Sequence, residues 1–310
     1  MPEPWTTMGA AAGDLFSTMP DSVSAAAKPP PPVIDAAAIA RRSKSNLAFA
    51  LGCLPAERRR DMITFYAFCR IVDDIADEEG FSLKDRRIQL AAWRRVVRGE
   101  QSAPDEVARD VVALPQKYGF SAALLEEIID GVSMDLENRR YETFAELQTY
   151  CYKVASVVGL VSLAIFGVDE GEGRDYAVNL GYGLQLTNIL RDVRVDWEND
   201  GRLYLPLEDM ARFGYTVEDV AARRHNAAFE ALMKFEAGRA GEFYAKSRAA
   251  MPKNHRGRLL AAEAMRQIYH GILVRMQEEG YRVYEKRYRL TKGHKAFILI
   301  SAWVRGLFAR

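Results

Sequence analysis

Two pairs of aspartates are the side chains in this sequence best placed to do chemistry. Asp73 and Asp77 form the first acidic pair, and Asp192 and Asp196 form the second. Residues four apart lie on one face of a helix, where like charges repel by about 0.2–0.5 kcal/mol. A sequence selected for stability alone would avoid this spacing, whereas a bound cation would turn the repulsion into attraction.

The neighbours of both pairs indicate a cation that meets an anionic substrate. Asn188 extends the face of the second pair by one turn, and Arg70 and Arg191 lie close to the two pairs. Oxygen ligands without His or Cys favour Mg²⁺, and the guanidinium fork suits phosphate. A lone DxxxD is usually a solvated surface pair. Two such pairs, each next to an arginine and apolar turns, predict a metal–diphosphate site.

The elements that must position these carboxylates are predicted to be helices throughout. Residues 1–34 are rich in Ala, Ser and Pro and are expected to be a disordered tail, and residues 35–310 a single all-α domain. Apolar residues recur at spacings of three and four, with Gly or Pro at the breaks. They predict helices over residues 55–78, 83–98, 121–138 (with Ser121 as N-cap), 143–166, 172–197, 226–250, 256–279 and 292–308.

Composition narrows the classes of function further. The net charge is only +1 over 310 residues, so no global field draws the protein to nucleic acid. Three unclustered cysteines suit a reducing cytosol. No apolar run was expected to reach the roughly 20 residues of a membrane span, and the longest was placed at 296–303. That C-terminal stretch is basic at its edges, so it could lie on a membrane surface or dock on the core as a last helix.

At these motifs the sequence resembles the squalene/phytoene synthases, which are head-to-head trans-prenyltransferases. The matching stretches are 43–45, 66–77, 150–159 and 185–196, the last of which continues into 201–206. The resemblance spans about residues 40 to 295 and is greatest to bacterial presqualene diphosphate and squalene synthases. Asn46, Ser156, Arg194 and Val195 depart from the usual family pattern.

The resemblance implies an isoprenoid synthase helical bundle with a central apolar cavity. It implies Mg²⁺ ligands at Asp73, Asp77, Asn188, Asp192 and Asp196. It implies diphosphate contacts at Ser43, Ser45, Tyr66, Arg70, Arg191 and Arg287, with Lys295 as a further basic residue. It places Tyr150 near the reacting carbons, and Ala155 and Gly159 along the channel for the prenyl chain.

The reaction implied is condensation of two farnesyl diphosphates to presqualene diphosphate and on to squalene, a last step that needs NADPH. The phytoene or dehydrosqualene branch remains an alternative because the sequence does not show pocket depth. A helical scaffold that binds cations is the non-enzymatic alternative. The expected location is the cytoplasm, with peripheral membrane contact through the C-terminal helix and no contact with nucleic acid.

Overall fold

The computed structural model describes residues 36, 51, 54–77, 80–137 and 140–307, without the side chains of Lys292, Leu299 and 302–307. The predicted tail over residues 1–34 lies outside these ranges, as do Ser43 and Ser45. The helices belong to one compact unit, residues 34–310.

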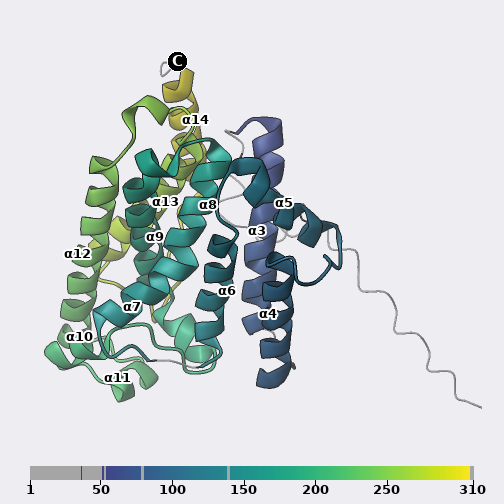
Figure 1. Cartoon of the computed structure of the whole chain (residues 1–310). Coiled ribbons are helices and arrows are strands. Elements are labelled where there is room, and N and C mark those ends of the chain that lie inside the picture. Colours follow the sequence, from purple (N-terminus) through teal and green to yellow (C-terminus); the bar gives the residue numbers. More distant parts are fainter. Residues whose placement is uncertain (1–35, 37–50, 52–53, 78–79, 138–139, 308–310) are drawn as a thin grey trace, which may run out of the picture. The chain divides into compact units, whose positions relative to one another are not determined.

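The prediction of an all-α fold is confirmed. Among the described residues the only β pairing is an isolated bridge between Arg140 and Leu203. The α-helices (Figure 1) are α3 (Ala56–Asp77), α4 (Leu83–Val97), α5 (Glu106–Tyr118), α6 (Ala123–Asp135), α7 (Phe144–Cys151), α8 (Val157–Phe166), α9 (Glu170–Glu198), α10 (Leu207–Arg212), α11 (Val217–Ala221), α12 (Ala227–Ala249), α13 (Leu260–Glu278) and α14 (Lys292–Leu307).

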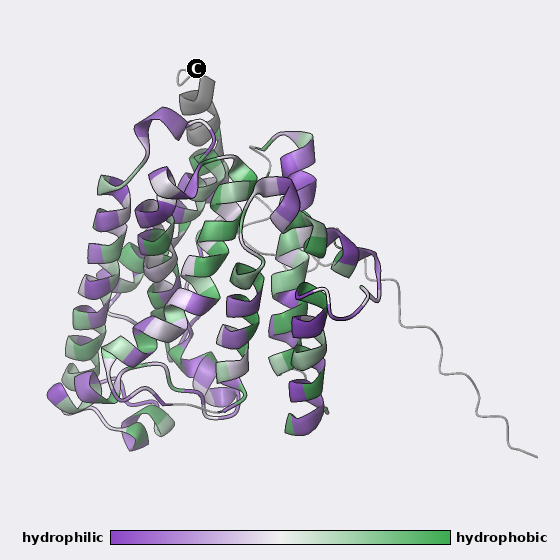
Figure 2. Ribbon diagram, viewed as in Figure 1, coloured by the Kyte–Doolittle hydropathy of each residue, from purple (hydrophilic) through white to green (hydrophobic). Residues whose placement is uncertain are grey.

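The long helix α9 is central to the packing, since it contacts α8, α12 and α13. Helix α8 in turn contacts α6 and α3. Figure 2 shows hydrophobic residues along α8 and a mixture of hydrophobic and hydrophilic residues on α12. A helix that is apolar on every side must be buried. This arrangement puts the apolar helix α8 between the two helices that carry the acidic pairs.

The stretch around α8 corrects the expectation about membrane spans. Phe144–Phe166 is long and apolar enough by composition to cross a bilayer, although half of its most apolar window is buried inside the protein. The stretch escapes prediction from sequence because Lys153 and several small polar residues interrupt its apolar run. Its apolar composition is explained more simply by burial in the helical bundle, as expected of a core helix.

A π-helical segment, Tyr152–Ser156, joins α7 to α8 and replaces the single straight helix that the sequence predicted. The backbones of α6 and α9 approach this π-helical segment very closely. A Cβ added to Gly181 of α9 would lie 2.5 Å from Cα of Ser156, and one added to Gly131 of α6 would lie 2.8 Å from Cβ of Lys153. The hydroxyl of Ser156 donates a hydrogen bond to the carbonyl of Val178 at 2.8 Å. The segment is therefore held on two sides.

Two local predictions differ from the structure. Helix α5 was not predicted, although Asp105 caps its start and Gly119 ends it in the left-handed conformation. Pro115 interrupts the helical signal there, yet a proline in the last turn costs only one hydrogen bond. The N-cap of α6 is Ala122, one residue later than the predicted Ser121, and its side chain makes no capping hydrogen bond. The hydroxyl of Ser121 accepts a hydrogen bond from the Ala123 amide.

Candidate active site

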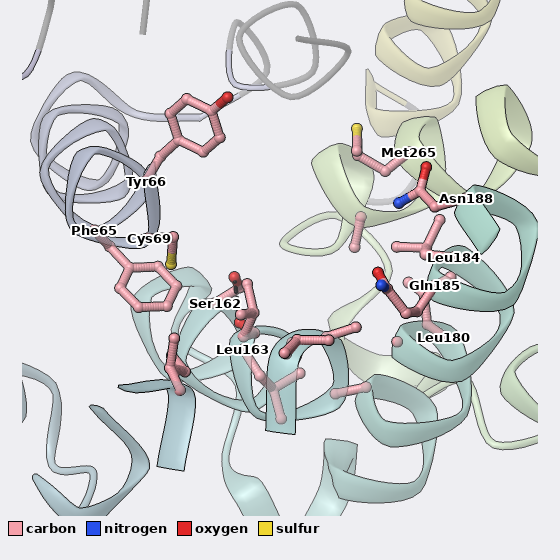
Figure 3. Close-up of a pocket in the computed structure, with 18 of the residues that line it drawn as sticks. Phe65, Tyr66, Cys69, Ser162, Leu163, Leu180, Leu184, Gln185, Asn188 and Met265 are labelled. Atoms are coloured by element: carbon pink, nitrogen blue, oxygen red, sulfur yellow. Dashed lines mark hydrogen bonds between the residues drawn. The ribbon is translucent and has the colours of Figure 1, made fainter. Parts of the chain in front are cut away.

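A cavity of about 410 Å³ opens between α3, α6, α8, α9 and α13. Figure 3 shows Tyr66 and Cys69 of α3 across the space from Leu184, Gln185 and Asn188 of α9, with Ser162 and Leu163 of α8 along one side. Most of the lining is aliphatic or aromatic. The volume lies within the range of about 300–1,000 Å³ that small-molecule pockets occupy.

Half of the predicted site residues line this cavity. They are Tyr66, Arg70, Asp73, Tyr150, Ala155, Gly159 and Asn188. The other described site residues do not line the cavity and belong to a network of charged side chains: Asp77, Arg191, Asp192, Asp196 and Arg287. The structure thus brings together motifs separated by more than a hundred residues, while the role of each residue stays a prediction.

The first acidic pair ends α3. Arg70 donates a hydrogen bond to Asp73 at 2.7 Å, and Arg202 donates one to Asp77 at 2.6 Å. Burial raises the pKa of Asp73 to about 7, because the carboxylates of Asp77 and Asp135 add to the effect and Arg70 offsets only part of it. A carboxylate with so high a pKa lacks sufficient positive charge nearby.

The second acidic pair sits near the end of α9 and shows opposite electrostatics at its two members. Burial alone would raise the pKa of Asp192, but hydrogen bonds from Arg191 and Arg287 lower it below its usual value. Arg287 donates to the two carboxylate oxygens of Asp192 from Nε and Nη2, each at 2.8 Å. Burial and the nearby Asp192 raise the pKa of Asp196 to about 8. The arginines therefore stabilise the charged form of Asp192, whereas the positive charge near Asp196 does not offset its burial.

These residues fit the predicted cation. The amide oxygen of Asn188 is buried and has no hydrogen-bond partner among the described residues. It lies on the same face as Asp192, one turn earlier. In the described ranges no three His, Cys, Asp or Glu side chains are close enough to hold a metal by themselves. Mg²⁺ usually takes one or two carboxylates and completes its shell with phosphate and water, so such a sparse donor set suits a site completed by substrate.

A carboxylate to which the sequence analysis gave no role lies between the two acidic pairs. Asp135, at the end of α6, accepts hydrogen bonds from Tyr150 at 3.0 Å and from Tyr204 at 2.7 Å. The rings of Tyr150 and Tyr204 stack with centroids 5.2 Å apart. Burial raises the pKa of Asp135 to about 6 even though both tyrosines and Arg202 oppose the shift. Asp135 and Tyr150 also line the cavity.

The basic residues from the C-terminal part of the chain approach the second acidic pair. Besides Arg287, Lys295 has a pKa lowered by burial and by the positive charges of Arg289 and Arg191. The positive charges of Arg191, Arg289 and Lys295 therefore lie close to one another, an arrangement that favours a bound anion. Arg191 also lies over the ring of Tyr269, a cavity residue, at 5.9 Å.

Comparison with known proteins agrees with this geometry. A family model described as squalene/phytoene synthase matches residues 40–294. The chain belongs to the squalene/phytoene synthase family. Members of this family are head-to-head prenyltransferases, so the matched helices and the cavity between them are those of a prenyltransferase.

Relatives within the squalene/phytoene synthase family divide between two products. A 15-cis-phytoene synthase from Synechocystis is 33% identical over 273 residues, which is 83% of this chain and 80% of the relative. A presqualene diphosphate synthase from Rhodopseudomonas palustris is 34% identical over 259 residues, 83% of this chain and 92% of the relative. Identity alone does not separate these two branches.

Solved structures of the family superpose well. A dehydrosqualene synthase with a bound ligand matches with a TM-score of 0.75 and 26% identity, covering 89% of this chain and 96% of the other. A squalene synthase from Alicyclobacillus acidocaldarius matches with a TM-score of 0.68 and 26% identity, covering 79% and 94%. The predicted isoprenoid synthase fold is confirmed.

Proposed function

We propose that the protein condenses two molecules of farnesyl diphosphate head to head, in an Mg²⁺-dependent reaction that gives presqualene diphosphate and, with NADPH, squalene. The observation that carries this choice of substrate is the depth of the cavity. Relatives at similar identity are named for both branches, so the choice of substrate rests on the space available to the prenyl chain.

The lining residues of α3 and α9 give the depth of the cavity. On α3 the lining residues run from Asp73 back to Met62, and on α9 they run from Asn188 back to Tyr176. With a rise of 1.5 Å per residue, these spans are about 16 and 18 Å. The far end is closed by apolar and aromatic side chains, namely Met62, Phe166, Tyr176 and Leu259.

A farnesyl chain matches this depth. Its main chain has eleven carbon–carbon bonds of about 1.5 Å, so its zigzag extends over roughly 14 Å, whereas a geranylgeranyl chain with fifteen bonds extends over roughly 19 Å. With the diphosphate at the level of Asp77 and Asp196, the prenyl chain begins near Asp73 and Asn188. A straight C15 chain is shorter than both helix spans, whereas a straight C20 chain is slightly longer than either.

The first step is loss of diphosphate from one substrate. Its C1–O bond breaks and both electrons leave with the diphosphate, which produces an allylic cation. Mg²⁺, when bound by the two acidic pairs and Asn188, would supply positive charge to the leaving group. Arg70, Arg191 and Arg287 lie beside these carboxylates, and their guanidinium forks are placed to bind diphosphate oxygens.

The second step joins the two chains. The C2–C3 electron pair of the second substrate bonds to C1 of the first, and loss of one proton closes a cyclopropane ring. Burial raises the pKa of Tyr150 well above its usual value, and its hydroxyl donates to Asp135, so this tyrosine stays protonated. We therefore assign the proton to the released diphosphate. The ring of Tyr150, which lines the cavity, can stabilise the cation, and the apolar lining keeps water away from it.

The test is incubation with Mg²⁺ and either farnesyl or geranylgeranyl diphosphate, with diphosphate release and product mass as readouts. We expect faster release from farnesyl diphosphate, with presqualene diphosphate as the product without NADPH. Turnover of geranylgeranyl diphosphate alone would place the protein in the phytoene branch. If diphosphate is released from neither substrate, the protein is better explained as a helical scaffold that binds cations.

A further inference from the structure

The last 25 residues differ in charge from the rest of the protein. Residues 286–310 contain seven Lys and Arg and no Asp or Glu, although the whole chain has a net charge of only +1. The preceding residues are therefore net acidic. Two of the seven basic residues already have acidic partners, since Lys286 pairs with Glu279 and Arg287 with Asp192. The excess positive charge is concentrated on α14 and the segment before it.

Helix α14 is docked on the bundle through only part of its surface. Ile298 is 4% exposed and belongs to the core, and α14 packs against α13. Phe297 and Ile300, by contrast, are 69% and 62% exposed, the highest values among the large hydrophobic side chains described. They lie three residues apart and thus share a face. Docking on the core accounts for Ile298 and leaves this second apolar face without an explanation.

We propose that this second face of α14 rests on an anionic lipid bilayer, with Phe297 and Ile300 inserted at the level of the headgroups. Basic residues next to an apolar helix face are the combination that holds peripheral helices on anionic membranes. Exposed Arg289 and His294 flank the helix start on the described surface. A bilayer fits the charge of this end of the chain better than a protein partner, because lipid headgroups offer negative charge over the whole contact area.

The test is cosedimentation of the full chain with vesicles of phosphatidylglycerol and phosphatidylcholine, compared with vesicles of phosphatidylcholine alone. We expect binding to the anionic vesicles that weakens steeply with salt, and little binding to the neutral ones. The double variant F297S/I300S should bind the anionic vesicles at least tenfold more weakly. Its diphosphate release from dispersed substrate should match wild type, because neither side chain lines the cavity.

The matched control is F81S/I88S, which removes two large hydrophobic side chains, 43% and 53% exposed, near the start of α4. This control should bind vesicles as wild type does. Absence of wild-type binding, or equal losses in the two double variants, would overturn the proposal. A change from dimer to monomer in F297S/I300S without any vesicle binding would instead assign the face to a second copy of the chain. Because vesicle binding is read without catalysis, failure here leaves the proposed function untouched.

Discussion

The hydroxyl of Tyr150 donates a hydrogen bond of 3.0 Å to Asp135, a carboxylate that Tyr204 also contacts at 2.7 Å. This link fixes the ring of Tyr150 at the point where the apolar cavity meets the acidic pairs. The orientation of that ring consequently depends on a residue from a different helix, α6, which the sequence motifs do not single out.

Replacing Asp135 with Asn should therefore slow catalysis more than it weakens substrate binding. An amide oxygen is a poorer acceptor for two phenols, and a hydrogen bond to a charged group contributes about 2 kcal/mol. We expect kcat to fall by roughly 30-fold, with a much smaller change in KM. Steady-state diphosphate release measures both. The control Asp130→Asn changes a half-buried carboxylate of the same helix that pairs with Arg94 and does not line the cavity, so it should leave kcat near wild type. Equal effects of the two variants would argue against the link.

The two acidic pairs should respond differently to removal of a single charge. Asp192 holds Arg191 and Arg287, so Asp192→Asn should lower the free energy of unfolding by about 2 kcal/mol. Asp73 has a raised pKa, so Asp73→Asn should leave the metal-free protein as stable as wild type or slightly more stable. Both variants should abolish turnover and keep the helical circular dichroism. Urea unfolding without Mg²⁺ compares their stabilities, and the opposite ranking would refute the assignment.

The stability of the metal-free protein should fall as pH rises, and the stabilising effect of Mg²⁺ should grow. Asp73 and Asp196 have pKa values of about 7 and about 8 in the folded protein against a reference of 3.8, so the folded state binds more protons between these limits. The metal-free protein should accordingly lose stability as pH rises from about 4 to about 8. Mg²⁺ competes with these protons, so its stabilising effect should be larger at pH 8.5 than at pH 6. Thermal unfolding with MgCl₂ or EDTA provides the measurement, and Asp196→Asn should weaken the trend.

The closed end of the cavity should determine chain length. Phe166→Ala removes a ring from that end, so the ratio of kcat/KM for geranylgeranyl over farnesyl diphosphate should rise about tenfold or more. Phe68→Ala removes the same ring from a fully buried site on α3 that does not line the cavity. Both changes should cost roughly 3–5 kcal/mol of stability. A change of selectivity in both variants, or in neither, would show that Phe166 does not set the limit.

The sequence predicted that both members of each acidic pair lie on one helix, and the structure shows this, because a spacing of four residues is a local property of a helix. The class of fold followed from apolar periodicity for the same reason. The role of the pairs as metal ligands stays a prediction. Asp135, Arg202 and the pairing of Arg287 with Asp192 escaped prediction because each depends on contacts between segments far apart in the chain. The depth of the cavity escaped it as well, since depth depends on how far α3, α8 and α9 overlap, and the π segment has no marked composition.

The tight contact between Ser156 and Gly181 bears on how such an enzyme can change its product over evolution. A Cβ added to Gly131 or Gly181 would collide with the π segment, so a larger residue at either position would have to displace it. In this chain, a change in cavity shape is therefore easier to reach by exchanging side chains along α8 than by moving the helix. A change of product can then arise from single substitutions on an unchanged backbone.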